Sequence, residues 1–201
     1  MSGVSAIVLA AGAGSRFGGD KLLAEFEGRP LIGHVLLALR DAPVDEIVVV
    51  VGVDAGRLRE VCEPYSARVV ENPDWALGQS TSVKAGLRAV DREARAAVVL
   101  LGDQPLVRAE AVQRLVEAFE EGAKVAVATY AGKRRNPVLF SRLVWPDLLA
   151  GLSGDEGARA LLRDRPELVV EVDCGGVGDP ADVDTDEDLR RLRGARTDAR
   201  L

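Results

Sequence analysis

Four glycines and two cationic side chains follow the first apolar run of the chain. The run 6–11 is typical of a strand that is buried on both faces. Glycines after such a strand let the backbone adopt positive φ and bring successive N–H groups close to an anion. Arg16 and Lys21 add two positive charges, which disfavour the alternative of an ordinary glycine-rich turn. The segment therefore predicts a phosphate-binding loop, whose glycines are Gly12, Gly14, Gly18 and Gly19.

This loop differs by one residue from each of two common phosphate-binding patterns. The dinucleotide fingerprint G-x-G-x-x-G requires a third glycine where Phe17 stands. The P-loop requires its lysine directly after the last glycine, and here Asp20 precedes Lys21. What remains is L-A-A-G-x-G-x-R-x-G-x-x-K over residues 9–21, which belongs to neither class.

Asp103 directly follows another fully apolar run, 96–101. A carboxylate at the end of a buried strand is costly unless it is paired or binds a metal ion. Mg²⁺ prefers one or two carboxylates together with phosphate oxygens and water. The position therefore predicts a magnesium ligand, and the alternative is a helix cap or a surface turn. If the two apolar strands are neighbours, Asp103 and the glycine loop face one crevice at the carboxyl ends of the strands.

Asp182 and Asp184 offer further carboxylates near the start of the last predicted helix. Taken alone, each is more typical of a residue that caps this helix, and Thr185 competes for the same role. Transfer to the α-phosphorus of a nucleoside triphosphate requires alignment and charge neutralisation rather than a protein nucleophile. The loop cations and a carboxylate-bound Mg²⁺ supply both, whereas one histidine and no hydrolase motif disfavour a zinc hydrolase.

Apolar runs alternate with helical patterns, which predicts βαβ units and a mostly parallel sheet. Strands are expected at 6–11, 47–51, 67–70, 96–101, 125–130, 136–140 and 168–172. Helices are expected at 31–41, 55–61, 79–90, 112–119, 143–149, 154–164 and 186–192. A basic turn is expected at 132–135 and a glycine-rich loop at 174–180. Residues 1–193 are expected to form one domain, and 194–201 a flexible tail.

Composition limits the partners and the compartment of the chain. The net charge of −6 disfavours a general nucleic-acid binder, which requires a basic face. Cys62 and Cys174 are far apart in the sequence and are expected to be unpaired thiols in a reducing compartment. No signal peptide and no membrane-length apolar run is apparent. We therefore expect a cytoplasmic protein without nucleic-acid or membrane partners.

Seven segments in order resemble the MobA-like NTP transferases, over residues 6–189. Within them the chain is most similar to the molybdenum cofactor cytidylyltransferases. The segments are L-A-A-G through K at 9–21, N-P-x-W-x-x-G at 72–78, S-V-x-x-G-L at 82–87, G-D-Q-P at 102–105, P-V-L-F at 137–140, G-D-x-G-A-R at 154–159 and D-V-D-T at 182–185.

The resemblance implies a Rossmann-like three-layer α/β/α sandwich of the nucleotide-diphospho-sugar transferase type, mostly parallel with one antiparallel strand. It implies catalytic roles for Arg16, Lys21 and Asp103. Mg²⁺ would be held by Asp103, Asp182 and Asp184. The nucleotide would contact Leu9, Ala10, Ala11, Gly12, Gly14, Ser15, Arg16, Lys21, Asn72, Ser82 and Gly102. The acceptor would contact Gln104, Arg135, Asn136 and Asp155.

The implied reaction is transfer of CMP from CTP to molybdopterin with release of pyrophosphate, and a molybdoenzyme or its maturation chaperone is an implied partner. Ser82 lies in a segment similar to one that reads cytosine in related cytidylyltransferases, which favours a pyrimidine. Trp75 is expected either to line the base pocket or to pack beneath its loop.

One segment departs from the family pattern. Relatives usually carry Gly-His-Pro before Val-Leu-Phe, whereas this chain has Arg135-Asn136-Pro137. This departure leaves open another phosphorylated acceptor, such as a sugar or polyol phosphate, and GTP as the donor. An NAD(P)-dependent oxidoreductase or a binding protein for molybdoenzyme maturation is the alternative of another class. The absent third glycine and the lack of an acidic residue after the run 47–51 disfavour the oxidoreductase.

Overall fold

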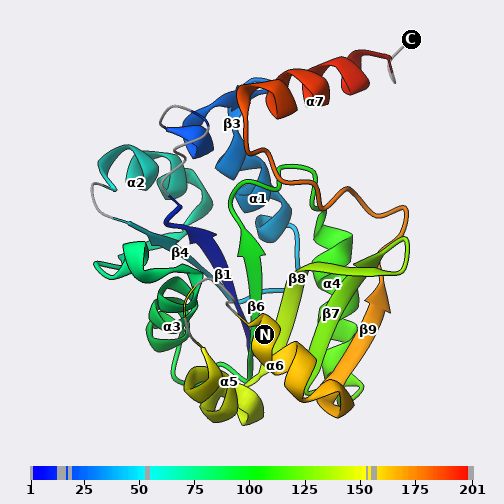
Figure 1. Cartoon of the computed structure of the whole chain (residues 1–201). Coiled ribbons are helices and arrows are strands. Elements are labelled where there is room, and N and C mark those ends of the chain that lie inside the picture. Colours follow the sequence, from blue (N-terminus) through cyan, green and yellow to red (C-terminus); the bar gives the residue numbers. More distant parts are fainter. Residues whose placement is uncertain are drawn as a thin grey trace.

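Seven strands form one sheet in the order β5-β4-β1-β6-β8-β7-β9 in this computed structural model, which describes residues 2–12, 17, 20–52, 55–152, 154 and 158–198 (Figure 1). The strands are β1 (Val4–Ala10), β4 (Glu46–Val51), β5 (Arg68–Glu71), β6 (Ala96–Leu101), β7 (Val125–Tyr130), β8 (Lys133–Ser141) and β9 (Val169–Asp173). The helices are α1 (Leu31–Arg40), α2 (Gly56–Cys62), α3 (Gln79–Ala89), α4 (Ala109–Glu120), α5 (Trp145–Gly151), α6 (Arg159–Asp164) and α7 (Asp186–Asp198). A separate small hairpin joins β2 (Glu25–Phe26) and β3 (Arg29–Pro30).

Strand β8 runs against the other strands of the sheet. It pairs antiparallel with β6 on one side and with β7 on the other. The pairs β1–β4, β1–β6, β4–β5 and β7–β9 are all parallel. The expected sheet, mostly parallel with one antiparallel strand, is confirmed.

Helices cover both faces of this sheet, because successive strand residues point to opposite sides. On one face Val8 of β1 belongs to the buried cluster that includes side chains of α1, α2 and α4. On the other face Ile7 belongs to the cluster that includes side chains of α3, α5 and α6. The helical residues are Leu36, Cys62 and Leu115 in the first cluster, and Leu87, Leu148 and Leu161 in the second. The three-layer α/β/α sandwich is thereby confirmed.

The central strands β1 and β6 are direct neighbours, and their carboxyl ends lie at the same edge. Leu9 pairs with Leu101, and the N–H of Gly102 donates to the carbonyl of Leu9 at 2.9 Å. Both strands point toward α7 and the β2–β3 hairpin (Figure 1). The segment after β1 and the segment after β6 therefore begin side by side, as the apolar runs predicted.

Several predicted boundaries differ from the structure, among them those of β8, α4, α6 and α7. The basic turn predicted at 132–135 is wrong, because the loop between β7 and β8 contains only Ala131 and Gly132. Both have positive φ, 49° and 72°, as two-residue hairpin turns of type I′ require. Helix α7 continues to Asp198, although a tail was predicted from residue 194, because extending a formed helix costs little per residue.

Gly86 allows α3 to lie close to β1. A Cβ on Gly86 would be 2.5 Å from Cγ2 of the fully buried Ile7, and a β-branched side chain cannot easily turn away. We expect Gly86→Ala to lower the free energy of unfolding by about 1–3 kcal/mol in urea denaturation. The control is Gly56→Ala in α2, where nothing lies within 4 Å of the added Cβ. Equal unfolding free energies for the two variants would contradict this packing.

Cys62 and Cys174 are free, as the sequence predicted, and both are buried. Burial raises the pKa of each thiol to about 11. A raised pKa keeps the thiol protonated, so at pH 8 only about one in 10³ is the reactive thiolate. We expect an aromatic disulfide reagent to modify neither cysteine in the native protein at pH 8, and both after unfolding. Rapid labelling of either thiol in the folded protein would contradict the burial of that thiol.

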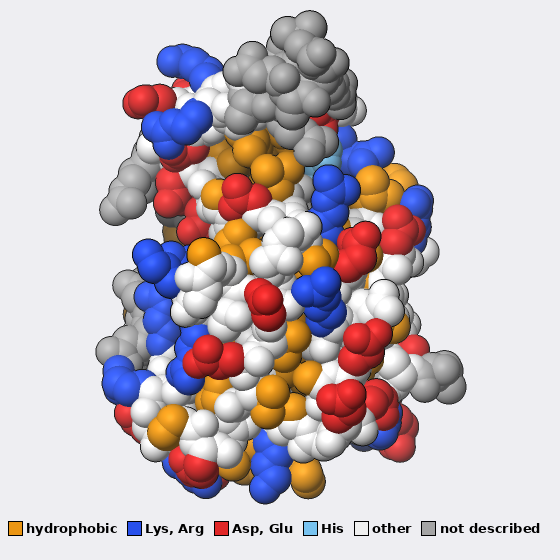
Figure 2. All heavy atoms as spheres, turned by 90° about the vertical axis from the view of Figure 1, so that its right-hand side faces the viewer, with side chains coloured by type: hydrophobic (Ala, Val, Ile, Leu, Met, Phe, Trp, Pro, Cys, Tyr) orange, Lys and Arg blue, Asp and Glu red, His pale blue; other side chains and the backbone are white. Residues whose placement is uncertain are grey.

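The surface around strand β9 carries charges of both signs. β9 is an edge strand of the sheet, and 44% of the surface of Val170 in this strand is exposed. The same strand carries the acidic residues Glu171 and Asp173. Figure 2 shows acidic and basic side chains interspersed over this face of the molecule. Charged edges discourage pairing with another chain.

None of the described helices combines the length and the apolar character that a membrane-spanning segment requires.

Candidate active site

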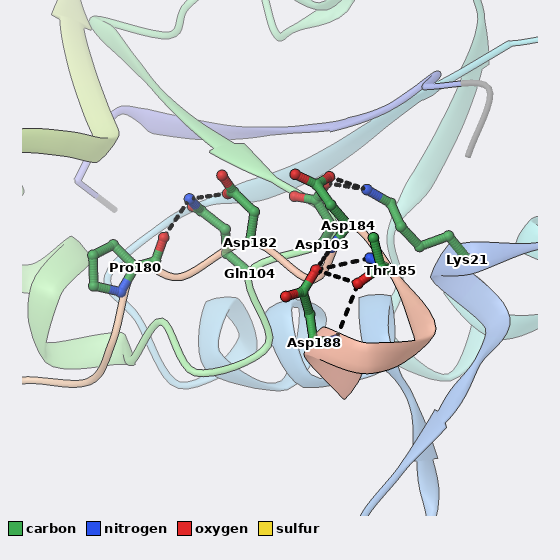
Figure 3. A network of polar contacts seen from close by, with 8 residues as sticks. All are labelled: Lys21, Asp103, Gln104, Pro180, Asp182, Asp184, Thr185 and Asp188. Atoms are coloured by element: carbon green, nitrogen blue, oxygen red, sulfur yellow. Dashed lines mark hydrogen bonds and ion pairs between the residues drawn. The ribbon is translucent and has the colours of Figure 1, made fainter. Parts of the chain in front are cut away.

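Lys21 and Asp103 meet at the carboxyl edge of β1 and β6. Lys21 begins a short 3₁₀ turn, Lys21–Leu23, and Asp103 lies two residues beyond the end of β6. The Nζ atom of Lys21 donates to Oδ2 of Asp103 at 2.7 Å (Figure 3). Both side chains are largely buried, with 13% and 20% of their surface exposed. Two residues that the sequence predicted for one site, 82 positions apart, are therefore in direct contact.

Asp184 reaches the same lysine from the C-terminal part of the chain. Its Oδ1 accepts a second hydrogen bond from Lys21 Nζ at 3.1 Å. Burial by itself would lower the pKa of Lys21, but the hydrogen bonds and charges of Asp103 and Asp184 outweigh it. The pKa of Lys21 therefore lies above its ordinary value, and the ammonium group stays charged at neutral pH.

Helix α7 is capped by residues other than the two predicted metal ligands. Thr185 Oγ1 accepts from the N–H of Asp188 at 3.1 Å, and Asp188 Oδ2 accepts from the N–H of Thr185 at 2.9 Å. This reciprocal pair is a capping box. The sequence left two roles open for Asp182 and Asp184, metal binding and capping of α7. The capping role is filled by Thr185 and Asp188.

Asp182 is bound by Gln104. Gln104 Nε2 donates to Asp182 Oδ1 at 2.7 Å and to the carbonyl of Pro180 at 2.8 Å. Asp182 is exposed as a residue, but partial burial of its carboxyl group raises its pKa, and the charge of Asp103 adds to this rise. The hydrogen bond from Gln104 acts in the opposite direction. Gln104, which the resemblance assigns to the acceptor, uses its amide N–H groups within the protein.

The donor atoms of the site fit a divalent cation bound together with a triphosphate. Asp103, Asp182 and Asp184 outnumber Lys21, so these four side chains sum to a charge of −2 when ionised. Asp103 Oδ1 is buried and receives no hydrogen bond from the described residues, which is costly without a further partner. Among those residues no three His, Cys, Asp or Glu side chains lie together in a group that could hold a metal ion. Mg²⁺ commonly takes few carboxylates and completes its shell with phosphate oxygens and water.

Asn72 and Ser82, which the resemblance assigns to the nucleotide, are bonded to each other on the β4–β5 side of β1. Asn72 Nδ2 donates to Ser82 Oγ at 3.0 Å and to Thr81 Oγ1 at 2.8 Å. Asn72 and Ser82 are each only 3% exposed. Trp75 packs on Gly52, where an added Cβ would be 3.2 Å from the indole ring. The ring therefore covers the residue that follows β4.

The remaining predicted residues lie along three segments. Asn136 continues β8 beyond the pair Val138–Val99, toward the carboxyl end of β6. Arg135 Nη1 donates to the carbonyl of Arg134 at 3.1 Å. Arg134, which was expected in an exposed turn, donates through Nε to Glu171 Oε1 at 2.8 Å. The residues at the ends of β1 and β6 are Leu9, Ala10, Ala11, Gly12 and Gly102. Six further residues that the sequence analysis singled out lie outside the described residues: Gly14, Ser15, Arg16, Gly18, Gly19 and Asp155.

The sequence did not reveal how residues 178–184, called here the strap, reach the site. The strap follows the loop after β6: Asp179 N donates to Leu106 O at 3.1 Å, and Val183 N donates to Asp103 O at 3.0 Å. These are main-chain bonds, which leave no side-chain pattern in the sequence. The T-x-x-D spacing of Thr185 and Asp188 was a readable signal, since it marks the cap of α7 and separates Asp182 and Asp184 from that role.

Comparison with known proteins places the chain among nucleotidyltransferases. Residues 6–170 match the MobA-like NTP transferase domain. A nicotine blue oxidoreductase of Paenarthrobacter nicotinovorans is 34% identical over 94% of this chain and 96% of its own length. A crystal structure of the Rv0371c homologue from Mycobacterium sp. strain JC1 is 35% identical, with a TM-score of 0.87 over 98% of both chains.

A second solved structure was determined with a metal ion. Rv0371c of Mycobacterium tuberculosis, in complex with manganese, is 30% identical, with a TM-score of 0.80 over 96% of this chain and 98% of that one. The family match covers most of the chain, and the solved structures agree with its fold. This chain therefore belongs to the MobA-like NTP transferase family and has the fold and the activity class of a nucleotidyltransferase.

Proposed function

We propose that this chain transfers CMP from CTP to molybdopterin, in a Mg²⁺-dependent reaction that releases pyrophosphate. The observation that carries the proposal is the buried Asp103 Oδ1, which has no hydrogen-bond partner among the described residues, beside the ammonium group of Lys21. The manganese complex of Rv0371c supports a divalent metal in this family. CTP is favoured because Ser82 lies in a segment that resembles a cytosine-reading one.

In the proposed reaction a phosphate oxygen of the acceptor attacks the α-phosphorus of CTP. The bond from this phosphorus to the bridging oxygen breaks, and pyrophosphate leaves with that oxygen. Two of the three N–H donors of Lys21 are used by Asp103 and Asp184, which leaves one for a phosphate oxygen. Mg²⁺ bound at Asp103 would neutralise charge on the triphosphate. Asp103 and Asp184 hold Lys21 in place, so little of its freedom is lost when the nucleotide binds.

The acceptor is proposed to approach from the β8 side of the site. Asn136 lies where β8 continues toward the carboxyl end of β6, and Arg135 beside it is exposed. Together they offer one hydrogen-bonding amide and one positive charge to an anionic acceptor. Asn136 stands where relatives usually carry a histidine. The assay must therefore also distinguish two alternatives: a sugar or polyol phosphate as the acceptor, and GTP as the donor.

Pyrophosphate release with each of the four NTPs, Mg²⁺ and molybdopterin tests the proposal. We expect release with CTP that depends on both the metal and molybdopterin. If pyrophosphate release requires a sugar or polyol phosphate instead, the acceptor is that phosphate and not molybdopterin. If release is faster with GTP than with CTP, the donor is GTP. No release with any of the four NTPs and these acceptors would refute the proposed function.

An oxidoreductase is the second candidate, because a relative with 34% identity carries that name. The loop after β1 lacks the dinucleotide fingerprint, which disfavours it. Thermal shift separates the candidates: we expect CTP with Mg²⁺ to raise Tm, and NAD(P)H to leave it unchanged.

We further propose that residues 1–193 act as one catalytic domain in the cytoplasm, and that a molybdoenzyme or its maturation chaperone receives the product.

A further inference from the structure

Gln104 is a buried polar residue inside the candidate site whose amide is directed at the strap. Only 2% of its surface is exposed. Its Nε2 donates to a main-chain carbonyl, that of Pro180, and to a side-chain carboxylate, that of Asp182 (Figure 3). The same side chain therefore fixes both the path of the strap and the orientation of an acidic group on it.

The orientation of the Gln104 amide is determined by its partners. Both groups near Nε2 are acceptors, so turning the amide over would place its oxygen against two other oxygens. The Oε1 atom is buried and has no hydrogen-bond partner among the described residues. A buried oxygen without a hydrogen bond lowers the stability of the fold, and the structure retains it together with both donor contacts. The amide is thus held in one direction at a cost to stability, which is typical of functional sites.

Asp182 and Asp184 are held by different side chains. Asp184 is bonded to Lys21 through Oδ1, and its own N–H donates to Asp188 at 3.2 Å. Val183 between them is bonded to Asp103 through its N–H and is 2% exposed. Among the described residues, the side-chain hydrogen bond to the Asp182 carboxylate comes from Gln104, and the charge of Asp103 repels this carboxylate.

We propose that Gln104 is a positioning residue that holds the Asp182 carboxylate in the arrangement that binds the metal–nucleotide complex. This inference rests on the proposed function, because it assigns Asp182 to the metal. Residues that orient metal ligands typically change metal affinity 10–100-fold when they are replaced. Gln104 acts through Asp182 and does not contact the substrate.

The test compares two identical substitutions in the full chain. Gln104→Met keeps the length of the side chain and removes both N–H donors and the unsatisfied oxygen. Gln113→Met on α4 is the matched control, because Gln113 is exposed and bonded only to Glu117 Oε1 among the contacts described, at 2.8 Å. Binding of Mn²⁺ in the presence of CTP is measured by the loss of the free-ion signal in electron paramagnetic resonance. Tm is measured without metal for each variant.

We expect Gln104→Met to weaken Mn²⁺ binding by about 10–100-fold and Gln113→Met to leave it unchanged. At saturating Mn²⁺ the kcat of Gln104→Met should return to within a few-fold of the parent value, since only the metal dependence is affected. In an Asp182→Ala background, Gln104→Met should have no further effect on Mn²⁺ affinity. If Gln104→Met does not fold, Gln104→Asn, whose shorter amide cannot reach both partners, serves for the same comparison.

The outcomes separate this inference from the proposed function. A folded Gln104 variant that binds Mn²⁺ as tightly as the parent would refute the positioning role alone. Additive losses in the Asp182→Ala background would also refute it, because Gln104 would then act through another group. A parent protein that binds no Mn²⁺ with any NTP would refute the proposed metal-dependent function instead.

Discussion

Asp103→Asn is expected to lower kcat/KM for nucleotidyl transfer at least about 10³-fold, or roughly 4 kcal/mol of transition-state stabilisation. The amide has the shape of the carboxylate but carries no charge, so it binds a divalent cation poorly. It also removes the charged partner of Lys21, whose Nζ lies 2.7 Å from Oδ2. Pyrophosphate release under varied Mg²⁺ provides the measurement, and Mn²⁺ binding should be weakened in parallel.

The matched control for this prediction is Asp147→Asn on α5. Asp147 is exposed and paired with Arg165 at 3.3 Å, and α5 lies at the other end of the sheet from the carboxyl edge of β1 and β6 (Figure 1). Because exposed ion pairs contribute little, both activity and metal binding should be retained. An Asp103→Asn enzyme that keeps a tenth or more of the parent kcat/KM would show that Asp103 does not hold the metal.

Lys21→Met is expected to lower kcat about 10²–10³-fold while Mn²⁺ binding is retained or tightened. The turnover falls because a positive charge directed at the developing charge of the reaction is lost. The metal stays because Asp103 and Asp184 are freed from their 2.7 Å and 3.1 Å contacts with the ammonium group. This opposite response of kcat and metal affinity distinguishes Lys21 from Asp103. Single-turnover kinetics with saturating CTP and Mg²⁺, together with Mn²⁺ titration, measures both.

Lys124→Met is the corresponding control, since Lys124 is exposed and precedes β7 at the amino edge of the sheet. Lys124→Met should change neither kcat nor the affinity for Mn²⁺. Lys21→Arg should restore little activity, because a planar guanidinium cannot reproduce the compact contact that one Nζ makes with two carboxylates. Loss of Mn²⁺ binding in a folded Lys21→Met protein would mean that the lysine organises the carboxylates rather than the phosphates.

The central strands of the sheet were predictable because they are buried on both faces. Runs such as 47–51 and 96–101 are apolar at every position, which only a buried strand or helix requires. The start of β8 was not predictable, because Lys133, Arg134 and Arg135 are exposed and resemble a turn. The chain reverses in only two residues there, and Ala131 in the first position of that turn is not a usual signal.

The contact of Lys21 with Asp103 was predictable because two parallel strands carry them to one edge. The position of the strap was not, because its pairing uses the main chain of Asp179 and Val183. Main-chain bonds can form with almost any side chain, so composition indicated only a loop. The role of Gln104 could not be separated from acceptor binding, since an amide at that position suits either role until its two partners are seen.

Lys21 and Asp184 lie 163 positions apart, and this separation also orders events during synthesis. At about 5–20 residues per second, the ribosome makes Lys21 on the order of ten seconds before Asp184. During that interval the ammonium group is present, but its second carboxylate partner is not. The pair of contacts that Lys21 makes in the structure can therefore be complete only after residue 184 has left the exit tunnel.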